Sequence, residues 1–297
     1  MDQETIQKHI QAGKIAAEAL HYGKSLIEPG AKVIEILDKI EEKIHQLGGQ
    51  LAFPAQISLN EFAAHSCSDL NDATILKDQV IKLDVGAHID GYIADNALTI
   101  DLSGKHEDLV KASREALNNA LKMIRPGVAL GEIGKVIYET ITSYGFSPVK
   151  NLSGHGLGHY NIHTSPSIPN FNNNNERILK EGDVIAIEPF ASTGAGIVQE
   201  SSPATVFTLL NEQGIRDPIT RNILKEIRTY KGLPFAKRWL EKKFTTPKTN
   251  FALRQLSAKD CIVHHPPLFD QARGMISQAE HTVIVLEKPI ITTWHEE

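Results

Sequence analysis

An internal repeat divides the 297-residue chain into two similar halves. Residues 18–49 align without a gap with residues 115–146, at an offset of 97. Both copies begin with Glu-Ala-Leu, carry Pro-Gly near the middle, and then show isoleucine at every fourth position. Each copy therefore predicts a helix, a Pro-Gly turn, a second amphipathic helix and a glycine that ends it.

Each predicted helix pair is followed by segments typical of strands. Residues 77–87 resemble residues 181–191, and residues 92–100 resemble residues 277–285. The two segments are adjacent in the first half, whereas roughly 80 further residues separate them in the second. We therefore expect an α+β fold with two α-then-β halves, related by a pseudo-two-fold axis, around a curved antiparallel sheet.

The further residues are interpreted as an inserted helical subdomain at 206–271, so that the main domain comprises residues 1–205 and 272–297. Helical patterns such as ITRNILKEIRTY and LPFAKRWLEKKF support this interpretation. Within the insert, residues 221–254 hold ten Lys or Arg against two Glu, a net charge of +8. A solvated helix face is the simpler explanation of this charge, and a patch that contacts nucleic acid, for instance ribosomal RNA, is the more specific one.

The stretch IKLDVGAHIDGYIAD, residues 81–95, predicts a buried hairpin that contains two acids. Asp90-Gly91 is a favoured two-residue hairpin turn, and the register that it sets puts Gly86 opposite Asp95. Period-two alternation then places Asp84 and Asp95 together on the face opposite to the apolar residues. Their side chains can therefore converge on one ion.

Two further acids align with these aspartates in the second half. Glu188 aligns with Asp84, and Glu280 aligns with Asp95. A solvated position on a sheet explains any one such acid by itself. Four carboxylates that face one another from apolar strands would repel strongly unless cations lie between them. The repeat therefore predicts a metal site.

A nitrogen ligand is expected from LSGHGLGHYNIH, residues 152–163, where histidine recurs every four residues. This spacing would form a stripe on a helix, but each of the three glycines in the segment disfavours a helix by about 1 kcal/mol relative to Ala. A loop or strand, whose glycines let the backbone approach a site, is the preferred interpretation. One histidine and four carboxylates suit Mn, Fe(II), Co or Zn. Four acids are more ligands than a single ion needs, so two ions are the better fit. A pair of such ions activates water and polarises a carbonyl.

The sequence shows no sign of export or membrane insertion. It contains no run of 18 apolar residues, and its first 20 residues predict an amphipathic helix rather than a signal peptide. Cys67 and Cys261 are the only cysteines, too few for a disulfide framework. These features predict a protein of the reducing cytoplasm that does not contact a membrane.

Four segments, in order along nearly the whole chain, resemble the type 2 methionine aminopeptidases, metallopeptidases of the pita-bread fold. They are KLDVGAHIDGYIAD, SGHGLGHYNIH, IAIEPFAS and SQAEHT. AFPAQISLNEFAAH, residues 52–65, is similar to the segment that carries a substrate-binding histidine in that family. The long insert resembles that of the type 2 enzymes, and the lack of a long polybasic N-terminal extension resembles the archaeal form. The main domain would then be a catalytic pita-bread domain.

The resemblance implies a ligand set for two divalent ions, which would be Co, Mn, Fe(II) or Zn. The implied ligands are Asp84, Asp95, His155, Glu188 and Glu280. Asp95 and Glu280 would bridge both ions, and Glu188 would also shuttle a proton. His159 matches no role in the family and is expected in a loop, and Cys67 is interpreted as a thiol that binds no metal.

The resemblance also implies how the substrate is bound. His65 and His163 would position the scissile peptide bond and stabilise the tetrahedral oxyanion. Phe53, Ile162 and Phe190 fall where the family lines its apolar methionine pocket, although plain core packing also explains Phe53 and Ile162. The implied reaction is hydrolysis of the first peptide bond of nascent polypeptides by a monomeric enzyme, with release of Met.

Two other classes of protein share the fold. Aminopeptidase P and prolidase use the same ligands, but they usually carry an N-terminal domain and a gap between the two glutamates shorter than the 92 residues found here. Non-catalytic relatives that bind RNA or protein partners have lost metal ligands, whereas all five are present in this sequence. An active methionine aminopeptidase is therefore the expected function.

Overall fold

The computed structural model describes residues 1–201 and 203–295, and both halves contain the predicted helix pair. The pairs are α1 (Gln3–Leu26) with α2 (Val33–Gln46) and α3 (Glu107–Leu121) with α4 (Leu130–Ser143). Gly30 and Gly127 lie between the two helices of each pair with φ of +96° and +88°, a conformation that glycine adopts without strain. The Pro-Gly turns therefore have the same role in both halves.

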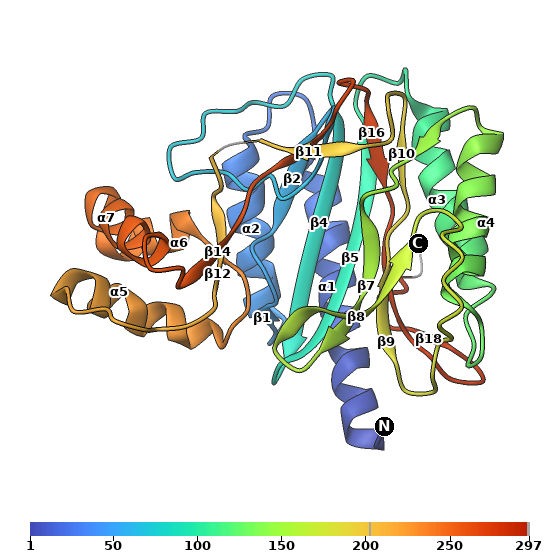
Figure 1. Cartoon of the computed structure of the whole chain (residues 1–297). Coiled ribbons are helices and arrows are strands. Elements are labelled where there is room, and N and C mark those ends of the chain that lie inside the picture. The colour runs from blue at the N-terminus through green and yellow to red at the C-terminus, as the bar shows by residue number, and fades with distance from the viewer. Residues whose placement is uncertain (202, 296–297) are drawn as a thin grey trace.

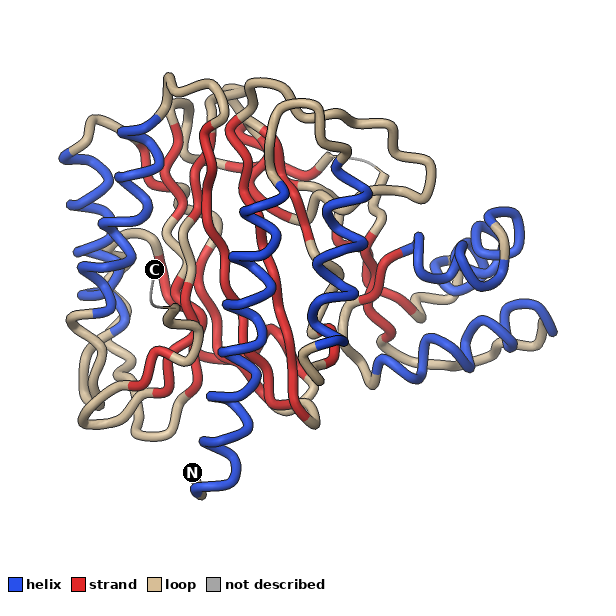
Figure 2. The backbone as a smooth tube through the Cα atoms, turned by 180° about the vertical axis from the view of Figure 1, so that it is seen from behind, coloured by secondary structure: helices blue, strands red, loops and turns tan. Residues whose placement is uncertain are grey.

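Two antiparallel sheets form the centre of the molecule (Figure 1). The first has the order β1-β4-β2 with β5 paired to β4, and the second has the order β18-β17-β9-β7-β8. Seen from behind in Figure 2, the helix pairs cover one side of these sheets. The strands are β1 (Gln50–Leu51), β2 (Gln56–Leu59), β4 (Val80–Ile89), β5 (Tyr92–Asp101), β7 (Ser153–Gly158), β8 (Asn161–Pro169), β9 (Val184–Ile187), β17 (His281–Ile284) and β18 (Ile290–Ile291).

The repeated isoleucines hold each helix pair against its sheet. In both halves they are almost completely buried within one apolar cluster that contains helix and strand residues. They are Ile36, Ile40 and Ile44 in α2 and Ile133, Ile137 and Ile141 in α4. Burial of such a side chain contributes roughly 1.5–3 kcal/mol, so the repeat identifies the core of each half.

The two sheets meet where β5 runs beside residues 278–282. The N–H of Glu280 donates to the carbonyl of Ala97 at 3.0 Å, and the N–H of Ala97 donates back at 3.4 Å. Nearby, the Thr282 hydroxyl accepts from the N–H of Asp95 and donates to its carbonyl, each at 2.8 Å. Strand β5, which carries Asp95, is therefore joined directly to the segment that carries Glu280, and the α+β arrangement expected from the repeat is confirmed.

The segment 206–271 contains the expected helices and also a small sheet that the sequence did not predict. Its helices, α5 (Pro218–Ile227), α6 (Lys237–Phe244) and α7 (Thr246–Ser257) with the short η1 (Arg228–Tyr230), project to one side in Figure 1. Strand β12 (Val206–Leu209) pairs with β13 (Phe235–Ala236) and with β14 (Ile262–His265). These elements share an apolar cluster of their own. Treating the segment as a separate subdomain remains a prediction.

Short strands connect the insert to the rest of the molecule. Strand β15 (Leu268–Asp270) pairs with β11 (Val198–Glu200) and with β3 (Phe62–Ala64), both outside the insert. The last residues of the insert are therefore bound to the edge of the region that carries the predicted site.

A further small sheet lies wholly outside the insert. Strand β10 (Phe190–Ser192) pairs with β6 (Ser147–Pro148) and with β16 (Ile276–Gln278).

A buried ion pair also fixes the insert to the main domain. Arg238 of α6 has no exposed surface and pairs with Glu41 of α2. The indole N–H of Trp239 donates to the same carboxylate at 2.9 Å. Arg238 also contacts the thiol of Cys67, whose pKa burial raises to about 12. Cys67 is therefore a protonated, buried thiol, and its expected lack of a metal remains a prediction.

None of the helices within residues 1–201 and 203–295 combines the length and the apolar character needed to cross a membrane.

Candidate active site

The β4–β5 hairpin has the register predicted from its turn. Asp90 and Gly91 have φ of +50° and +87°, and Gly86 lies opposite Asp95. Asp84 therefore lies on the same face as Asp95, opposite Ala97 and away from the apolar core of the first half. The sequence argument for a pair of aspartates on one face is confirmed.

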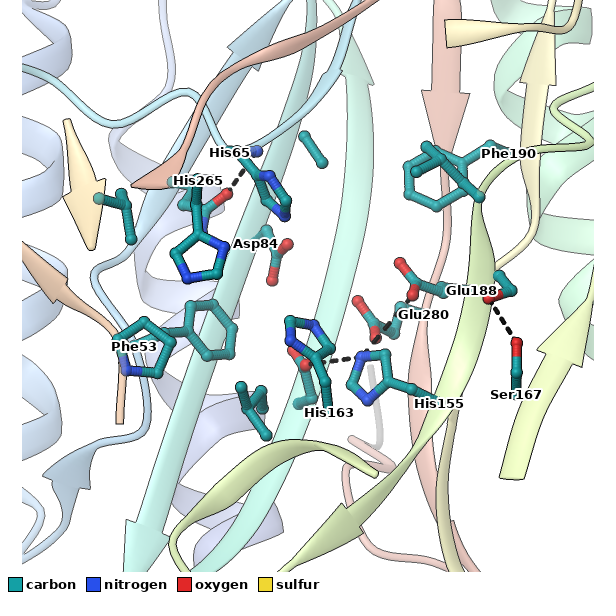
Figure 3. A pocket seen from close by; sticks show the side chains of 18 of the residues that line it. Phe53, His65, Asp84, His155, His163, Ser167, Glu188, Phe190, His265 and Glu280 are labelled. Carbon is teal, nitrogen blue, oxygen red and sulfur yellow. Dashed lines mark hydrogen bonds and ion pairs between the residues drawn. The ribbon is translucent and has the colours of Figure 1, made fainter. Parts of the chain in front are cut away.

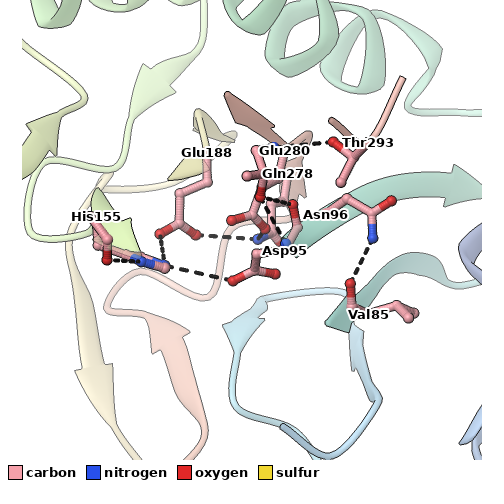
Figure 4. Close-up of polar contacts among 10 residues, drawn as sticks. Val85, Asp95, Asn96, His155, Glu188, Gln278, Glu280 and Thr293 are labelled. Carbon is pink, nitrogen blue, oxygen red and sulfur yellow. Dashed lines mark hydrogen bonds and ion pairs between the residues drawn. The ribbon is translucent and has the colours of Figure 1, made fainter. Parts of the chain in front are cut away.

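The glutamates come from breaks between strands of the second half. Glu188 lies between β9 and β10, and Glu280 lies between β16 and β17. Figures 3 and 4 show both side chains pointing toward the aspartates of the first half. All four predicted acids therefore converge, two from each half, across the join between the sheets.

His155 reaches this cluster because glycines flank it. A Cβ atom on Gly154 would lie 2.3 Å from the carbonyl oxygen of Ala186, and one on Gly156 would lie 2.3 Å from that of Ser165. Only glycine permits such a close approach of the neighbouring backbone. The segment forms the hairpin of β7 and β8, so the strand interpretation is confirmed and a helix is not formed.

Imidazole and carboxylates lie within range of a shared ion. Nε2 of His155 is 3.7 Å from Oδ2 of Asp95 and 3.7 Å from Oε1 of Glu188. One ligand atom each from Asp95, His155 and Glu280 lie within 4.8 Å of one another, and all three residues are buried. Asp84 completes the group on the side of β4.

Withdrawal from water makes the ionised acids unfavourable in the absence of a cation. It raises the pKa of Asp84 to about 7. Burial, reinforced by the charges of neighbouring carboxylates, holds the pKa values of Asp95, Glu188 and Glu280 well above their usual range. Burial also lowers the pKa of His155 to about 3, so this imidazole is neutral and can offer a lone pair to a metal.

Three carboxylate oxygens in the cluster are buried without a hydrogen-bond partner among the described residues. They are Oδ1 of Asp84, Oδ1 of Asp95 and Oε1 of Glu280. Buried polar atoms normally have partners, so such a concentration of exceptions requires an explanation. Divalent ions would supply the missing partners, and one nitrogen with several carboxylate oxygens is the donor set that Mn, Fe(II), Co and Zn accept. The residues therefore fit the implied metal site.

A cavity of about 470 Å³ opens beside the cluster, and all ten predicted site residues line it (Figure 3). Its apolar end lies at Phe53 and Ile162, whereas Phe190 lines the opposite side from a separate apolar cluster; all three are almost fully buried. Phe53 and Ile162 also belong to an apolar cluster between the halves. They therefore have the packing role proposed as an alternative and face the cavity as well.

Two histidines lie at the edge of the cavity. His65 has a φ of +63°, and its backbone N–H donates to Oε1 of Gln56 at 2.7 Å. Burial lowers the pKa of His65 to about 4, so its ring is neutral. The ring of His163 lies 4.5 Å from that of His155, measured between centroids. Both predicted histidines therefore line the cavity, and the ring of His163 lies against that of the predicted ligand His155.

Sequence reasoning missed several residues of the site. His265 of β14 lines the cavity with its ring 5.7 Å from that of His65, and Val206 and Pro234 line it as well. All three belong to the insert, which therefore forms one wall of the cavity. Gln278 was also missed, although it lies two residues before Glu280 and period-two alternation could have placed it on the same face.

His159 lies outside the cluster, as expected. It occupies the turn between β7 and β8, and its Nε2 is 2.7 Å from the carbonyl oxygen of Asp90. Its ring lies 4.9 Å from that of Tyr92. His159 therefore connects the tips of two hairpins rather than offering a ligand.

The model for metallopeptidase family M24 matches residues 7–216 of the chain. This protein belongs to metallopeptidase family M24. The chain is 44% identical to the methionine aminopeptidase of Methanocaldococcus jannaschii over 296 residues, which cover 99% of this chain and 100% of the relative. It is 47% identical to the methionine aminopeptidase of Thermococcus onnurineus over 288 residues, which cover 96% and 98%.

Solved structures share the fold of this M24 protein at lower sequence identity. A thermophilic Arx1 superposes with a TM-score of 0.87 at 18% identity, covering 100% of this chain and 92% of that one. The methionine aminopeptidase of Thermotoga maritima superposes with a TM-score of 0.74 at 23% identity, covering 99% of this chain and 98% of that one. The prolidase of Pyrococcus furiosus gives 0.64 at 20% identity, covering 100% of this chain and 65% of the prolidase. The expected pita-bread fold is thus confirmed.

Proposed function

We propose that this M24 protein is a methionine aminopeptidase that removes the N-terminal Met from nascent polypeptides with two divalent ions. The observation that carries the proposal is the convergence of one imidazole and four carboxylates beside a cavity with an apolar end. The archaeal methionine aminopeptidases at 44% and 47% identity over nearly the whole chain support the same activity.

The acid cluster would hold the ions in this proposal. Their ligands would be Asp84, Asp95, His155, Glu188 and Glu280. Divalent ions held in this way supply Lewis-acid polarisation of a carbonyl and activation of water at neutral pH. Both halves of the fold contribute ligands, so neither half alone would contain a complete site.

The side chains beside the cluster would position the substrate and move protons. Neutral His65 and His163 would donate N–H groups to the oxygen of the scissile carbonyl, where negative charge develops. The Glu188 carboxylate would accept a proton from the attacking water and return it to the leaving nitrogen.

Phe53, Ile162 and Phe190 would bind the methionine side chain. Removing a methionine side chain from water contributes roughly 1.5–3 kcal/mol to binding. Since this contribution would be lost with a polar first residue, the apolar end of the cavity would select the substrate. The neighbouring carboxylates would attract the free α-amine, which makes the proposed reaction that of an exopeptidase.

Release of Met from a Met-Ala-Ser peptide by the Mn²⁺-reconstituted protein tests the proposal. We expect activity in the wild type and a loss of about 100-fold or more in kcat for Glu188→Gln, because the amide cannot accept the proton. A series of peptides with proline in second position separates this activity from that of prolidase-like M24 enzymes. Faster hydrolysis of the proline series than of Met-Ala-Ser would contradict the proposal.

A ribosome contact through residues 221–254 is a second part of the proposed function. Five of the ten basic side chains in this segment form ion pairs within the chain, which lowers the charge available to RNA. The exposed basic residues outside these pairs are Arg221, Lys225, Lys231, Lys248 and Arg254. We expect salt-sensitive pelleting with ribosomes that is lost when these five are replaced by Gln. Unchanged pelleting of that variant would exclude the contact.

We also propose that the enzyme works as a monomer in the cytoplasm. The cavity is built from one chain, because every predicted site residue lines it without a partner subunit. Light scattering coupled to size-exclusion chromatography is expected to give a mass close to 32.7 kDa. A mass of twice this value at micromolar concentration would contradict the monomer.

A further inference from the structure

Gln278 of β16 is an uncharged side chain in contact with the acid cluster. It is buried, with 1% of its surface exposed. Its Nε2 lies 3.4 Å from Oε2 of Glu188 and 3.3 Å from Oε2 of Glu280 (Figure 4). One amide group therefore contacts two of the carboxylates that would hold the ions.

The ionised carboxylates that a metal site requires favour one orientation of the amide. Its Oε1 is buried and has no hydrogen-bond partner among the described residues. Rotating the amide by 180° would point this oxygen at Glu188 and Glu280, where like partial charges would repel. Keeping both N–H groups on the carboxylates thus leaves the carbonyl oxygen unpaired, an arrangement that buried amides normally avoid.

Residues from both halves hold the backbone of Gln278 in place. The Thr99 hydroxyl of β5 accepts from the N–H of Gln278 at 2.8 Å and donates to its carbonyl at 2.6 Å. On its other side Gln278 pairs with Phe190 of β10. The backbone that carries the amide is therefore fixed by β5, which also carries Asp95, and by β10, which carries Phe190 of the cavity wall.

We propose that Gln278 is a positioning residue that determines which oxygen of each glutamate faces the metal ions. The amide holds Oε2 of both glutamates. Oε1 of Glu280 is left without a partner, and Oε1 of Glu188 faces Nε2 of His155 at 3.7 Å. The inference rests on the proposed function only in that divalent ions occupy the cluster. Partners of this kind commonly change metal affinity by about 10–100-fold.

Replacement of Gln278 by Met tests the inference, because the Met side chain has a similar length but carries no N–H group. We expect Gln278→Met to bind Mn²⁺ about 10–100-fold more weakly in a titration followed by electron paramagnetic resonance. The visible absorption spectrum of the Co²⁺-loaded protein should also change, since the glutamates would rotate. Gln278→Asn, whose amide is one methylene too short to reach both acids, should show the same two effects.

Asn170 offers a matched control. It is equally buried, its carbonyl oxygen also lacks a partner among the described residues, and its amide donates to the carbonyl of Leu152 rather than to an acid. Asn170→Leu should lose stability but keep the Mn²⁺ affinity and the Co²⁺ spectrum of the wild type.

The outcomes separate the inference from the proposed function. Wild-type Mn²⁺ affinity and an unchanged Co²⁺ spectrum in either Gln278 variant would overturn the inference alone. If Gln278→Met does not fold, the Mn²⁺ affinity and the Co²⁺ spectrum of Gln278→Asn decide whether the inference holds. A wild-type protein that binds no Mn²⁺ at the cluster would instead remove the proposed metal-dependent function.

Discussion

Gly86 illustrates how little space the residues around the site leave. It lies on the same face of β4 as Asp84, and a Cβ atom at this position would be 2.1 Å from the ring of Phe53. We expect Gly86→Ala to push this ring out of the apolar end of the cavity and to lower the free energy of unfolding by about 1–3 kcal/mol. KM for Met-Ala-Ser should rise more than kcat falls. Thermal unfolding and steady-state kinetics measure the two effects.

A second substitution provides the control for this prediction. Phe53→Leu removes the ring atoms that the new Cβ would meet, so the Gly86→Ala/Phe53→Leu double variant should be less destabilised than the sum of the two single variants. Strict additivity of the two changes in free energy of unfolding would show that Gly86 and Phe53 do not compete for the same space.

The residues that sequence could identify are those that the repeat or a turn fixes. Asp84 and Asp95 could be paired because an Asp-Gly turn sets the hairpin register, and the glutamates followed from the alignment of the halves. His265 could not be identified, because its strand lies in the insert and has no counterpart in the first half. Gln278 has no aligned acid to draw attention to it, and only its spacing from Glu280 is informative.

At the scale of elements, the attachment of α6 to α2 depends on the ion pair of Arg238 with Glu41. Both side chains are buried, so removing Arg238 leaves the Glu41 carboxylate without an opposite charge, although Trp239 still donates to it. We expect Arg238→Ala to lower the free energy of unfolding by about 3–5 kcal/mol. Because the insert forms a wall of the cavity, KM should rise as well. Chemical denaturation and kinetics test both expectations.

The exposed pair of Lys242 and Asp38, between the same two helices, is the matched control. Their side chains lie 2.7 Å apart, but each is more than a third exposed. Lys242→Ala should therefore change the free energy of unfolding by less than about 1 kcal/mol and leave KM unaltered. Similar losses in Lys242→Ala and Arg238→Ala would mean that burial of the Arg238 pair has no special importance.

Sequence patterns predicted long elements better than short ones. The helices of both halves and the β4–β5 hairpin follow from periodicity sustained over ten residues or more. The sheet of the insert was missed because β12 and β14 have four residues each and β13 has two. Patterns this short cannot be distinguished from loops, and their partners lie far away in the sequence.

At the scale of the whole molecule, the fold places four acids where metal-free protein must retain protons. Burial raises the pKa of Asp84 to about 7, and it holds the pKa values of Asp95, Glu188 and Glu280 well above their usual range. In the unfolded chain these groups have lost their protons by pH 6.5. The repeat predicted this convergence, but the depth of burial depends on the insert and on packing between the halves, which no local pattern records.

The free energy of unfolding of the metal-free protein should therefore fall as pH rises from 6.5 to 8.5. In this range the folded state binds more protons than the unfolded state, so the slope of stability against pH is negative. Buried histidines have the opposite effect, because burial lowers the pKa of His65 to about 4 and that of His155 to about 3. Their contribution is confined to pH values below about 6.5, where unfolded imidazoles take up protons. Urea denaturation at pH 6.5, 7.5 and 8.5 measures the slope.

Divalent ions should reverse this slope, because they replace the retained protons as partners of the carboxylates. In excess Mn²⁺, ligands that must lose protons bind more tightly as pH rises, so the free energy of unfolding should rise or stay constant between pH 6.5 and 8.5. Asp84→Asn, which removes one titrating acid, should reduce the negative slope of the metal-free protein. Stability that is independent of pH in the metal-free protein would show that the four acids retain no protons, and the electrostatic case for a shared metal site would fail with it.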